Sequence, residues 1–412
     1  MGHGPARRPR RRDLVWFAAA SSLPLPWVVA HGVGGMGASP ELISLLAGLA
    51  IVGGAFLLSF ATELAERDIP QSLALLVLAL VSVLPEYAVD LHFAWKAGED
   101  VSYAPYAVAN MTGSNRLLIG FGWALVALVG CRRQRTNELA LDPRQGLEIR
   151  FLLLATIYSF LIPLDGSIGL FDAGVLLTIF ALYVLRAMRG GADEVELEGP
   201  PALIDHEFRD LGRRIWSFAL FVFAAYAIYI SAEPFAEGLV HVGRNHGFDE
   251  FLLVQWLAPL ASESPEFLIA VLFAWKGRAS VGIGALVSSK VNQWTLLVGA
   301  IPIAFALSSS GFDGLPLDAR QTEELLLTSA QSLLATILIA DMRFGRNEAL
   351  LLGVLFLGQL LLPSTEVRWG FMGAYLLISL ALLLGATPAR RRSFVGLLRP
   401  GGFLPVGRGR EG

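Results

Sequence analysis

Two stretches of the chain repeat each other: residues 84–98 read LPEYAVDLHFAWKAG, and residues 264–278 read SPEFLIAVLFAWKGR. The pair Pro85-Glu86 of the first stretch recurs as Pro265-Glu266 in the second. The tetrapeptide FAWK follows each glutamate at the same distance. Agreement of this kind between two apolar segments indicates an internal repeat. Each copy also places a proline and a carboxylate inside a hydrophobic run, so these segments bear on both the fold and the chemistry.

The composition predicts a membrane protein. Of 412 residues, 54% are hydrophobic and only 16% are charged, against about 25% charged in an ordinary soluble domain. This balance argues against a soluble enzyme. Apolar runs of about 20 residues, the length that a helix needs to cross a bilayer, recur between short charged loops. A membrane β-barrel would instead show segments of about 10 residues with alternating polarity, so we predict an all-α polytopic membrane protein.

Several other classes are disfavoured. The formal charge of −3 gives no reason to expect a nucleic-acid partner. A single cysteine, Cys131, cannot form an internal disulfide or a cysteine-based metal site. The six histidines never take the His-Glu-x-x-His spacing of a zinc enzyme. We expect no cofactor, and the expected partners are the lipid bilayer and transported metal cations.

Hydropathy predicts two sets of five core spans. The predicted core spans are 42–66, 69–97, 103–130, 149–165 and 168–188, then 214–243, 249–276, 280–307, 322–342 and 346–363. Apolar stretches at 13–35 and 368–386 flank them. We treat 13–35 as a retained span and not a signal peptide, because Pro24 and Pro26 interrupt it and no small-residue cleavage site follows.

The corresponding domain organisation has five parts. They are an N-terminal part at 1–41 with an extra helix, a first repeat at 42–188, an acidic linker at 189–213, a second repeat at 214–363, and an extra helix with a basic tail at 364–412. The linker is short, polar and acidic, which is typical of a solvated connection. An odd number of spans separates the two Pro-Glu segments, so the second repeat should be inverted relative to the first.

The distribution of arginine predicts the orientation, because loops rich in Lys and Arg stay cytoplasmic. If every span crosses and the N-terminus is inside, the cytoplasmic side collects the arginine clusters near residues 7–12, 132–150, 186–214 and 390–392. The other side keeps only Lys96, Arg244, Arg320 and Arg368. We therefore predict twelve crossings in the plasma membrane, with both termini cytoplasmic.

The Pro-Glu segments offer the ligands of a cation site. Proline lacks an amide hydrogen, so Pro85 and Pro265 would leave the carbonyls of Val81 and Ala261 without their helical donor. Ser82 and Ser262 precede the two glutamates by one turn on the same face. Oxygen ligands of this kind suit Na⁺ or Ca²⁺. A carboxylate in mid-bilayer costs about 2.5–3.5 kcal/mol on insertion scales, which argues for a function.

The span after each Pro-Glu segment carries more polar residues. Serines there could serve helix packing as well as ligation, whereas an asparagine and a lysine favour a site. The candidates are Asn110, Ser114 and Asn115 in the first repeat, and Ser289, Lys290, Asn292 and Gln293 in the second.

These motifs resemble the cation/calcium exchanger superfamily, which includes the sodium/calcium exchangers. That family carries two inverted repeats, each with a Gly-Thr-Ser-x-Pro-Glu motif followed by a Gly-Ser-Asn motif, in a ten-helix fold. The resemblance covers about 42–363, including residues 51–55 (IVGGA) and Pro70 before the first motif. It implies that Glu86 and Glu266 hold the transported cation with Ser82, Ser262, Ser114 and Ser289.

The chain departs from that pattern at informative positions. Val83 and Glu263 replace hydroxyl residues, Lys290 stands where the second repeat normally has asparagine, and Arg116 follows Asn115. These departures disfavour a full set of sodium sites.

The charges of the site residues leave two roles open for Arg116 and Lys290. Glu86, Asp90, Glu263 and Glu266 carry −4 if ionised, and the two cations reduce this to −2, which one divalent ion would balance. Lys290 could act as a tethered cation that couples transport to protons, since a buried lysine changes its pKa readily. Alternatively, Arg116 and Lys290 form fixed ion pairs with Glu86 or Glu263.

The expected function is secondary antiport of Ca²⁺ or another metal cation against H⁺ or Na⁺ by alternating access, since a polar site within inverted repeats is typical of such transporters. Two alternatives remain at this point. One is an organic-anion transporter that uses Arg116 and Lys290. The other, an intramembrane hydrolase with paired carboxylates, does not explain the inverted symmetry.

Overall fold

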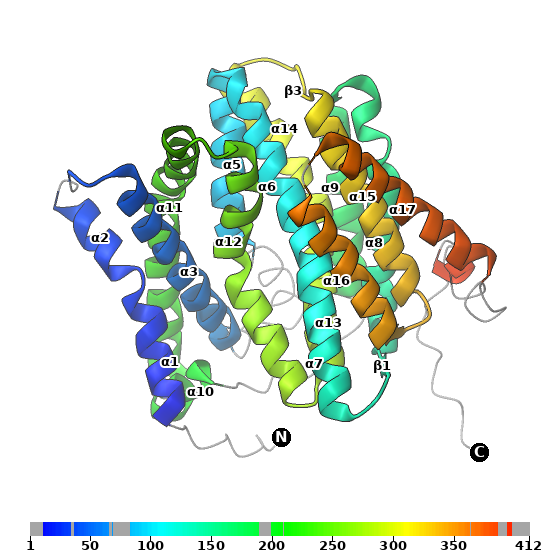
Figure 1. Ribbon diagram of the computed structural model, residues 1–412. Helices are drawn as coiled ribbons and strands as arrows, with labels where there is room; N and C mark the ends of the chain where they lie inside the picture. Colours follow the sequence, from blue (N-terminus) through cyan, green and yellow to red (C-terminus); the bar gives the residue numbers. More distant parts are fainter. Residues whose placement is uncertain are drawn as a thin grey trace, which may run out of the picture. The chain divides into compact units, whose positions relative to one another are not determined.

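The computed structural model describes residues 11–33, 37–65, 68, 83–188, 199–208, 210–362, 364–385 and 394–397, and these are overwhelmingly helical (Figure 1). The contacts between Cα atoms divide the chain into two units. Unit 1 comprises Met1–Phe93 and Val184–Pro265, and unit 2 comprises Ala94–Tyr183 and Glu266–Gly412. Each unit therefore combines segments of both predicted repeats.

Unit 1 is built on two long helices, α3 (Pro40–Ala65) and α11 (Asp210–His246), which pack along each other. Small residues permit their close approach. A Cβ atom at Gly54 would lie 2.8 Å from Ile228 Cγ1, and one at Gly48 would lie 2.8 Å from the ring of Phe235. Unit 1 also contains α1 (Arg11–Ser22), α2 (Leu25–Gly32) and the first parts of α5 (Leu84–Glu99) and α12 (Glu250–Trp275).

The predicted first span is broken where the sequence suggested. Helix α1 ends at Ser22 and α2 begins at Leu25, with Pro24 at the N-cap of α2. Trp27 on α2 is buried and donates a hydrogen bond from Nε1 to the carbonyl of Ile230 at 3.1 Å, which fixes α2 on α11.

The described part of the linker differs from the solvated connection that we predicted. Residues Pro200–Glu207 form helix α10, whose Ala202 and Ile204 are buried in the core of unit 1 with residues of α1, α3 and α11. Arg213 fixes this helix through Asp205, at 3.1 Å, and also contacts Asp68 at 2.8 Å. The acidic composition of the linker concealed these two apolar residues, which pack one short helix against unit 1.

Unit 2 contains a longer helix series, interrupted twice by π-helical turns. The first repeat contributes α6 (Ala104–Leu117), a π-helical turn at Leu118–Trp123, α7 (Ala124–Gln134), α8 (Gly146–Ser159) and most of α9 (Leu170–Ala187). The second contributes the end of α12, α13 (Ala279–Asn292), a π-helical turn at Gln293–Leu297, α14 (Val298–Ser309), α15 (Ala319–Ile339) and α16 (Arg346–Leu361), followed by α17 (Thr365–Leu384).

The two halves of unit 2 correspond at an offset of 175 residues, the offset that relates Ser114 to Ser289. At this offset the π-helical turns coincide in sequence, α9 falls on α16 within about one residue, and α8 falls inside the longer α15. In Figure 1, α6 and α7 descend while α13 and α14 ascend within this unit. Opposite directions of equivalent helices are what inverted repeats require.

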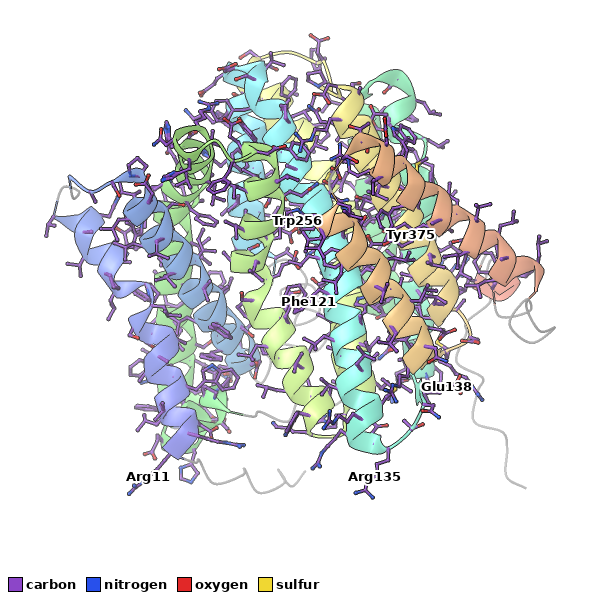
Figure 2. The ribbon with its side chains drawn as sticks, in the orientation of Figure 1. Arg11, Phe121, Arg135, Glu138, Trp256 and Tyr375 are labelled. Atoms are coloured by element: carbon purple, nitrogen blue, oxygen red, sulfur yellow. The ribbon has the colours of Figure 1, made fainter. Side chains whose placement is uncertain are left out.

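Two small antiparallel sheets join the loops of unit 2. Strand β1 (Glu138–Ala140) pairs with β4 (Arg343–Gly345), and β2 (Ser167–Ile168) pairs with β3 (Leu315–Pro316). At this offset β1 corresponds to β3, and β2 corresponds to β4. Strand β1 therefore pairs with the counterpart of β2, and β2 pairs with the counterpart of β1. This exchange of partners follows if equivalent loops lie at opposite ends of the unit. Arg135 and Glu138 mark the end at which α7 finishes (Figure 2).

Nine helical segments in the described ranges are long and apolar enough to cross a membrane. They correspond to nine of the twelve predicted spans. Of the other three, 69–97 is described only from residue 83, α16 has 16 residues, and α15 is rich in buried polar residues. The protein is thus a polytopic helical membrane protein, and twelve crossings remain a prediction.

Candidate functional site

The first Pro-Glu pair lies at the start of a helix. Helix α5 begins at Leu84, so Pro85 and Glu86 occupy its first turn, where a missing amide hydrogen costs nothing. Glu86 is 3% exposed, and Asp90, one turn later on the same face, is fully buried. Helix α5 therefore carries two buried carboxylates. The predicted ligands Val81 and Ser82 lie outside the described residues.

The second Pro-Glu pair lies inside a continuous helix. Helix α12 contains Pro265, so the carbonyl of Ala261 lacks its usual helical donor. Ser262 is buried and donates from Oγ to the carbonyls of Ala258 and Pro259, at 3.2 and 3.3 Å. Its hydroxyl oxygen keeps lone pairs that can accept or ligate. Glu263 is also buried.

Glu266 is half-buried as a residue, but one of its carboxylate oxygens is fully enclosed. Its Oε2 atom is buried and finds no hydrogen-bond partner among the residues that the structure describes, and the same holds for Oγ of Ser289 on α13. A buried carboxylate oxygen without a donor is costly. A cation would supply the missing partner.

The polar residues of the following span are all inside unit 2. Asn110, Ser114 and Asn115 on α6 are fully buried, as is Lys290 on α13, while Ser289, Asn292 and Gln293 are nearly so. Asn115 donates from Nδ2 to the carbonyl of Met111 at 2.7 Å, which directs its Oδ1 away from its own helix. The structure thus places all of these predicted residues in the interior of unit 2.

Lys290 donates a hydrogen bond to Oδ1 of Asn115. Its Nζ lies 2.5 Å from Oδ1 of Asn115 and 4.2 Å from the ring centroid of Trp294, a cation–π distance. Asn115 and Lys290 are equivalent positions of the two repeats at the offset of 175 residues. A fixed ion pair of Lys290 with Glu86 or Glu263 was the expected alternative. The structure gives Lys290 an amide partner in Asn115, and its ion pair with Glu86 or Glu263 stays a prediction.

Arg116 has a partner that the sequence did not suggest. Its Nη2 lies 2.5 Å from Oε2 of Glu324 on α15, and both side chains are 1% exposed. Its Nη1 donates to Oε1 of Gln359 on α16 at 3.4 Å. Glu324 stands near the end of a predicted span, where a charged residue is ordinary, so the sequence offers no reason to single it out. Gln331 and Gln359, two polar residues inside predicted spans, are the features of the sequence that could have indicated this buried polar cluster.

The described carboxylates do not form a ready metal cage. Within the ranges described, no group of three or more His, Cys, Asp or Glu residues is placed to hold a metal ion. A cation would therefore need oxygens of other kinds as well, such as hydroxyls, amides and carbonyls, which are the ligands that Ca²⁺ accepts.

This fold, with buried carboxylates and a repeated polar helix pair, defines a polytopic transporter of ions. The family model for the sodium/calcium exchanger protein matches residues 41–189 and 216–364. The chain belongs to this family, which confirms the resemblance drawn from the Pro-Glu segments. Its members are cation/calcium exchangers, so the protein is a transporter and not an enzyme.

Solved structures of exchangers have the same fold. The chain is 45% identical to the crystal structure of the H⁺/Ca²⁺ exchanger CAX, with a TM-score of 0.89 that covers 94% of this chain and 98% of that chain. It is 17% identical to the native YfkE structure (TM-score 0.62, covering 87% and 99%), and 18% identical to the sodium-calcium exchanger NCX_Mj (TM-score 0.52, covering 78% and 96%). The last two show the fold alone.

A curated relative matches over a shorter stretch. It is the putative antiporter CaxA of Alkalimonas amylolytica, which is 27% identical over 157 residues. The match spans 37% of this chain and 44% of that protein.

Proposed function

We propose that the protein is a Ca²⁺/H⁺ antiporter in which Glu86 and Glu266 bind the transported cation. The proposal rests on the two Pro-Glu segments, on the burial of Glu86 and of the Oε2 atom of Glu266, and on the 45% identity to a structure of an H⁺/Ca²⁺ exchanger. The further ligands are Ser82, Ser262, Glu263, Ser114, Asn115 and Ser289, with the carbonyls of Val81 and Ala261. Asn110, Asn292 and Gln293 complete the polar lining.

The observation that carries the choice of protons over sodium is the position of Lys290. A fully buried ammonium occupies a place where the resemblance to sodium/calcium exchangers implies an asparagine. A fixed positive charge there disfavours a sodium ion beside it. An ammonium in a low-dielectric interior can instead release and take up a proton.

The charges of the remaining site residues also favour proton coupling. Arg116 is neutralised by Glu324, so it no longer offsets the site carboxylates. Ionised Glu86, Asp90, Glu263 and Glu266 with Lys290 carry −3 together. A bound Ca²⁺ leaves one negative charge, which one proton would neutralise.

We further propose the membrane arrangement that the arginines indicate. Two inverted five-helix repeats, at 42–188 and 214–363, lie in the plasma membrane with an extra helix at each end. Both termini and the 189–213 linker are cytoplasmic. The exchanged strand partners of unit 2 support the inversion.

The alternative of an organic-anion transporter has lost its main support. It needs Arg116 and Lys290 as an anion site, but Arg116 is engaged with the buried carboxylate of Glu324. A guanidinium in a buried ion pair offers little attraction for a second anion.

Efflux of radioactive calcium from proteoliposomes tests the proposal. The full chain is reconstituted at a clamped membrane potential, and efflux is compared in Na⁺ and in an impermeant cation across several pH values. We expect transport that is driven by a proton gradient and insensitive to Na⁺. A strict requirement for Na⁺ with a flat pH dependence would overturn proton coupling, and no calcium movement under any gradient would overturn calcium exchange.

A further inference from the structure

Four charged side chains form a buried cluster in unit 2. Arg116 pairs with Glu324, and Arg368 on α17 pairs with Glu323 at 2.6 Å and with Glu324 at 3.5 Å. The exposed fraction of each side chain is 5% or less. Two cations and two anions make the cluster neutral by itself, which is the condition under which buried charges are tolerated.

The side chains of two glutamines, Gln331 and Gln359, connect the charged cluster to the backbone of α6. Gln331 on α15 donates to the backbone carbonyl of Arg116 at 3.0 Å and accepts from Gln359 Nε2 at 2.9 Å. Gln359 also donates to the hydroxyl of Tyr375 on α17, at 3.4 Å. Arg116 is two residues before the π-helical turn that begins at Leu118, where the regular helical hydrogen bonds are reorganised. Gln331 supplies a donor to that carbonyl.

The repeat allows the ion pair between Glu323 and Arg368 to be compared with the equivalent position in the first half. Glu323 is equivalent to Glu148 of α8 at the offset of 175 residues. Glu148 has a buried Oε2 without a hydrogen-bond partner in the described part of the chain, whereas Glu323 has Arg368. Arg368 belongs to α17, which follows the second repeat and lies outside the family match.

We propose that this cluster is a clamp that sets the position of α6, and that Arg116 is its positioning residue. Arg116 directly follows Ser114 and Asn115 on α6. By holding the end of α6 on α15, α16 and α17, the clamp fixes the register of these two ligands. Helix α17 is therefore a working part of the exchanger and not an appendage. This inference rests on the proposed function only for its effect on transport.

Thermal unfolding of the full chain in detergent tests the clamp without any transport. Glu323→Gln leaves the guanidinium of Arg368 short of one charge, and we expect the apparent Tm to fall by about 5 °C or more. The matched control is Glu148→Gln at the equivalent position, where a buried carboxylate without a cationic partner in the described part of the chain is replaced, and Tm should stay unchanged or rise. Arg343→Gln, which breaks the exposed pair with Glu138 at 3.3 Å, should change nothing.

A neutral double variant separates lost charge from lost packing. In Glu323→Met with Arg368→Met, one anion and one cation leave together. We expect at least half of the loss in Tm to be recovered, because burying no unpaired charge removes the main penalty. A double variant that is less stable than Glu323→Gln would overturn the clamp.

Arg116→Lys tests the positioning role. Lysine keeps the positive charge but loses the planar fork that reaches Glu324 and Gln359. We expect faster hydrogen–deuterium exchange across 104–123, together with an increase of about tenfold in KM for Ca²⁺ and little change in kcat. If both the exchange and KM match the wild type, Arg116 is not a positioning residue. If the wild type moves no Ca²⁺, the proposed function falls, while Tm and hydrogen exchange still decide the clamp.

Discussion

Lys290 Nζ contacts Asn115 Oδ1 at 2.5 Å, and these two residues hold equivalent positions in the two repeats. Two equivalent residues can meet only near the axis that relates their repeats. The lysine therefore sits at the local symmetry axis of unit 2, where it breaks the symmetry by placing an ammonium against an amide. A residue at this point is adjacent to ligand-bearing positions of both α6 and α13.

The first prediction concerns Lys290 itself. Lys290→Asn should reduce the dependence of calcium efflux on pH, because the only cationic member of the site is lost. Efflux is measured at clamped potential from pH 6 to 8, and the slope of log rate against pH should fall by about half or more. Combining Lys290→Asn with Glu263→Ser restores the residue types of the sodium exchangers and should produce a response to Na⁺. An unchanged pH slope in Lys290→Asn would leave Lys290 as a structural partner of Asn115 and Trp294.

The second prediction concerns the two glutamates. Glu86→Gln and Glu266→Gln should each lower calcium transport by about 100-fold or more, since amides keep the size but lose the charge that offsets a desolvated cation. Both variants should insert and migrate as monodisperse protein in size-exclusion chromatography. Glu138→Gln, at an exposed carboxylate, is the control. Near-normal exchange by either site variant would assign that glutamate to packing.

The third prediction is topological. Cys131 is the only cysteine and is buried, so single cysteines can be introduced into a Cys131→Ser background. Phe312→Cys, at a side chain that is 91% exposed, should react with an impermeant maleimide from outside intact cells. Arg144→Cys should react only after the membrane is permeabilised. Labelling of both positions from the same side would refute the inverted arrangement.

The fourth prediction concerns the attachment of α10. Burial opposes the charge of Asp68, but hydrogen bonds from Arg213 and Arg214 outweigh it and hold the pKa of this carboxyl below its ordinary value. A lowered pKa means that the stabilisation is present above the unfolded value and disappears only as pH falls through the folded value. Cleavage by Glu-C after the exposed Glu207 should therefore be equally slow at pH 7 and pH 5.

Loss of Asp68 should loosen this attachment. In Asp68→Asn, cleavage after Glu207 at pH 7 should be about fivefold faster, which corresponds to about 1 kcal/mol of local stability. Glu99→Gln, which removes the exposed partner of Lys96, is the control and should not change the rate. Protection that is unchanged in Asp68→Asn would show that the attachment of α10 does not depend on Asp68.

Much of the architecture was predictable because hydropathy sets span limits directly. The predicted spans at 42–66, 249–276 and 346–363 end within two residues of α3, α12 and α16. The π-helical turn at Leu118–Trp123 was not predictable, because it arises from packing between helices and leaves no periodic signal. The same holds for α10, where burial of Ile204 depends on partners far away in the sequence.

The candidate site was predictable in its residue types but not in its pairings. The repeat identified Glu86, Glu266 and Lys290, yet a sequence does not say which charges meet. Arg368 is 4% exposed and bound to Glu323, a pairing that its place near the outer end of a predicted span does not indicate. Adjacent glutamates at the start of α15 resembled an ordinary helix end, and only the fold shows that two arginines distant in sequence converge on them.

The crossed pairing of β1 with β4 and of β2 with β3 has a consequence for the halves as separate polypeptides. A chain that carried only the first repeat would present both β1 and β2 with open edges, and each would lack the strand that completes it. Two such chains packed head to tail would satisfy both, because β1 of each copy would pair with β2 of the other. In this sense the protein corresponds to two paired copies of one repeat joined in a single polypeptide, and each loop sheet pairs a strand of one repeat with a strand of the other.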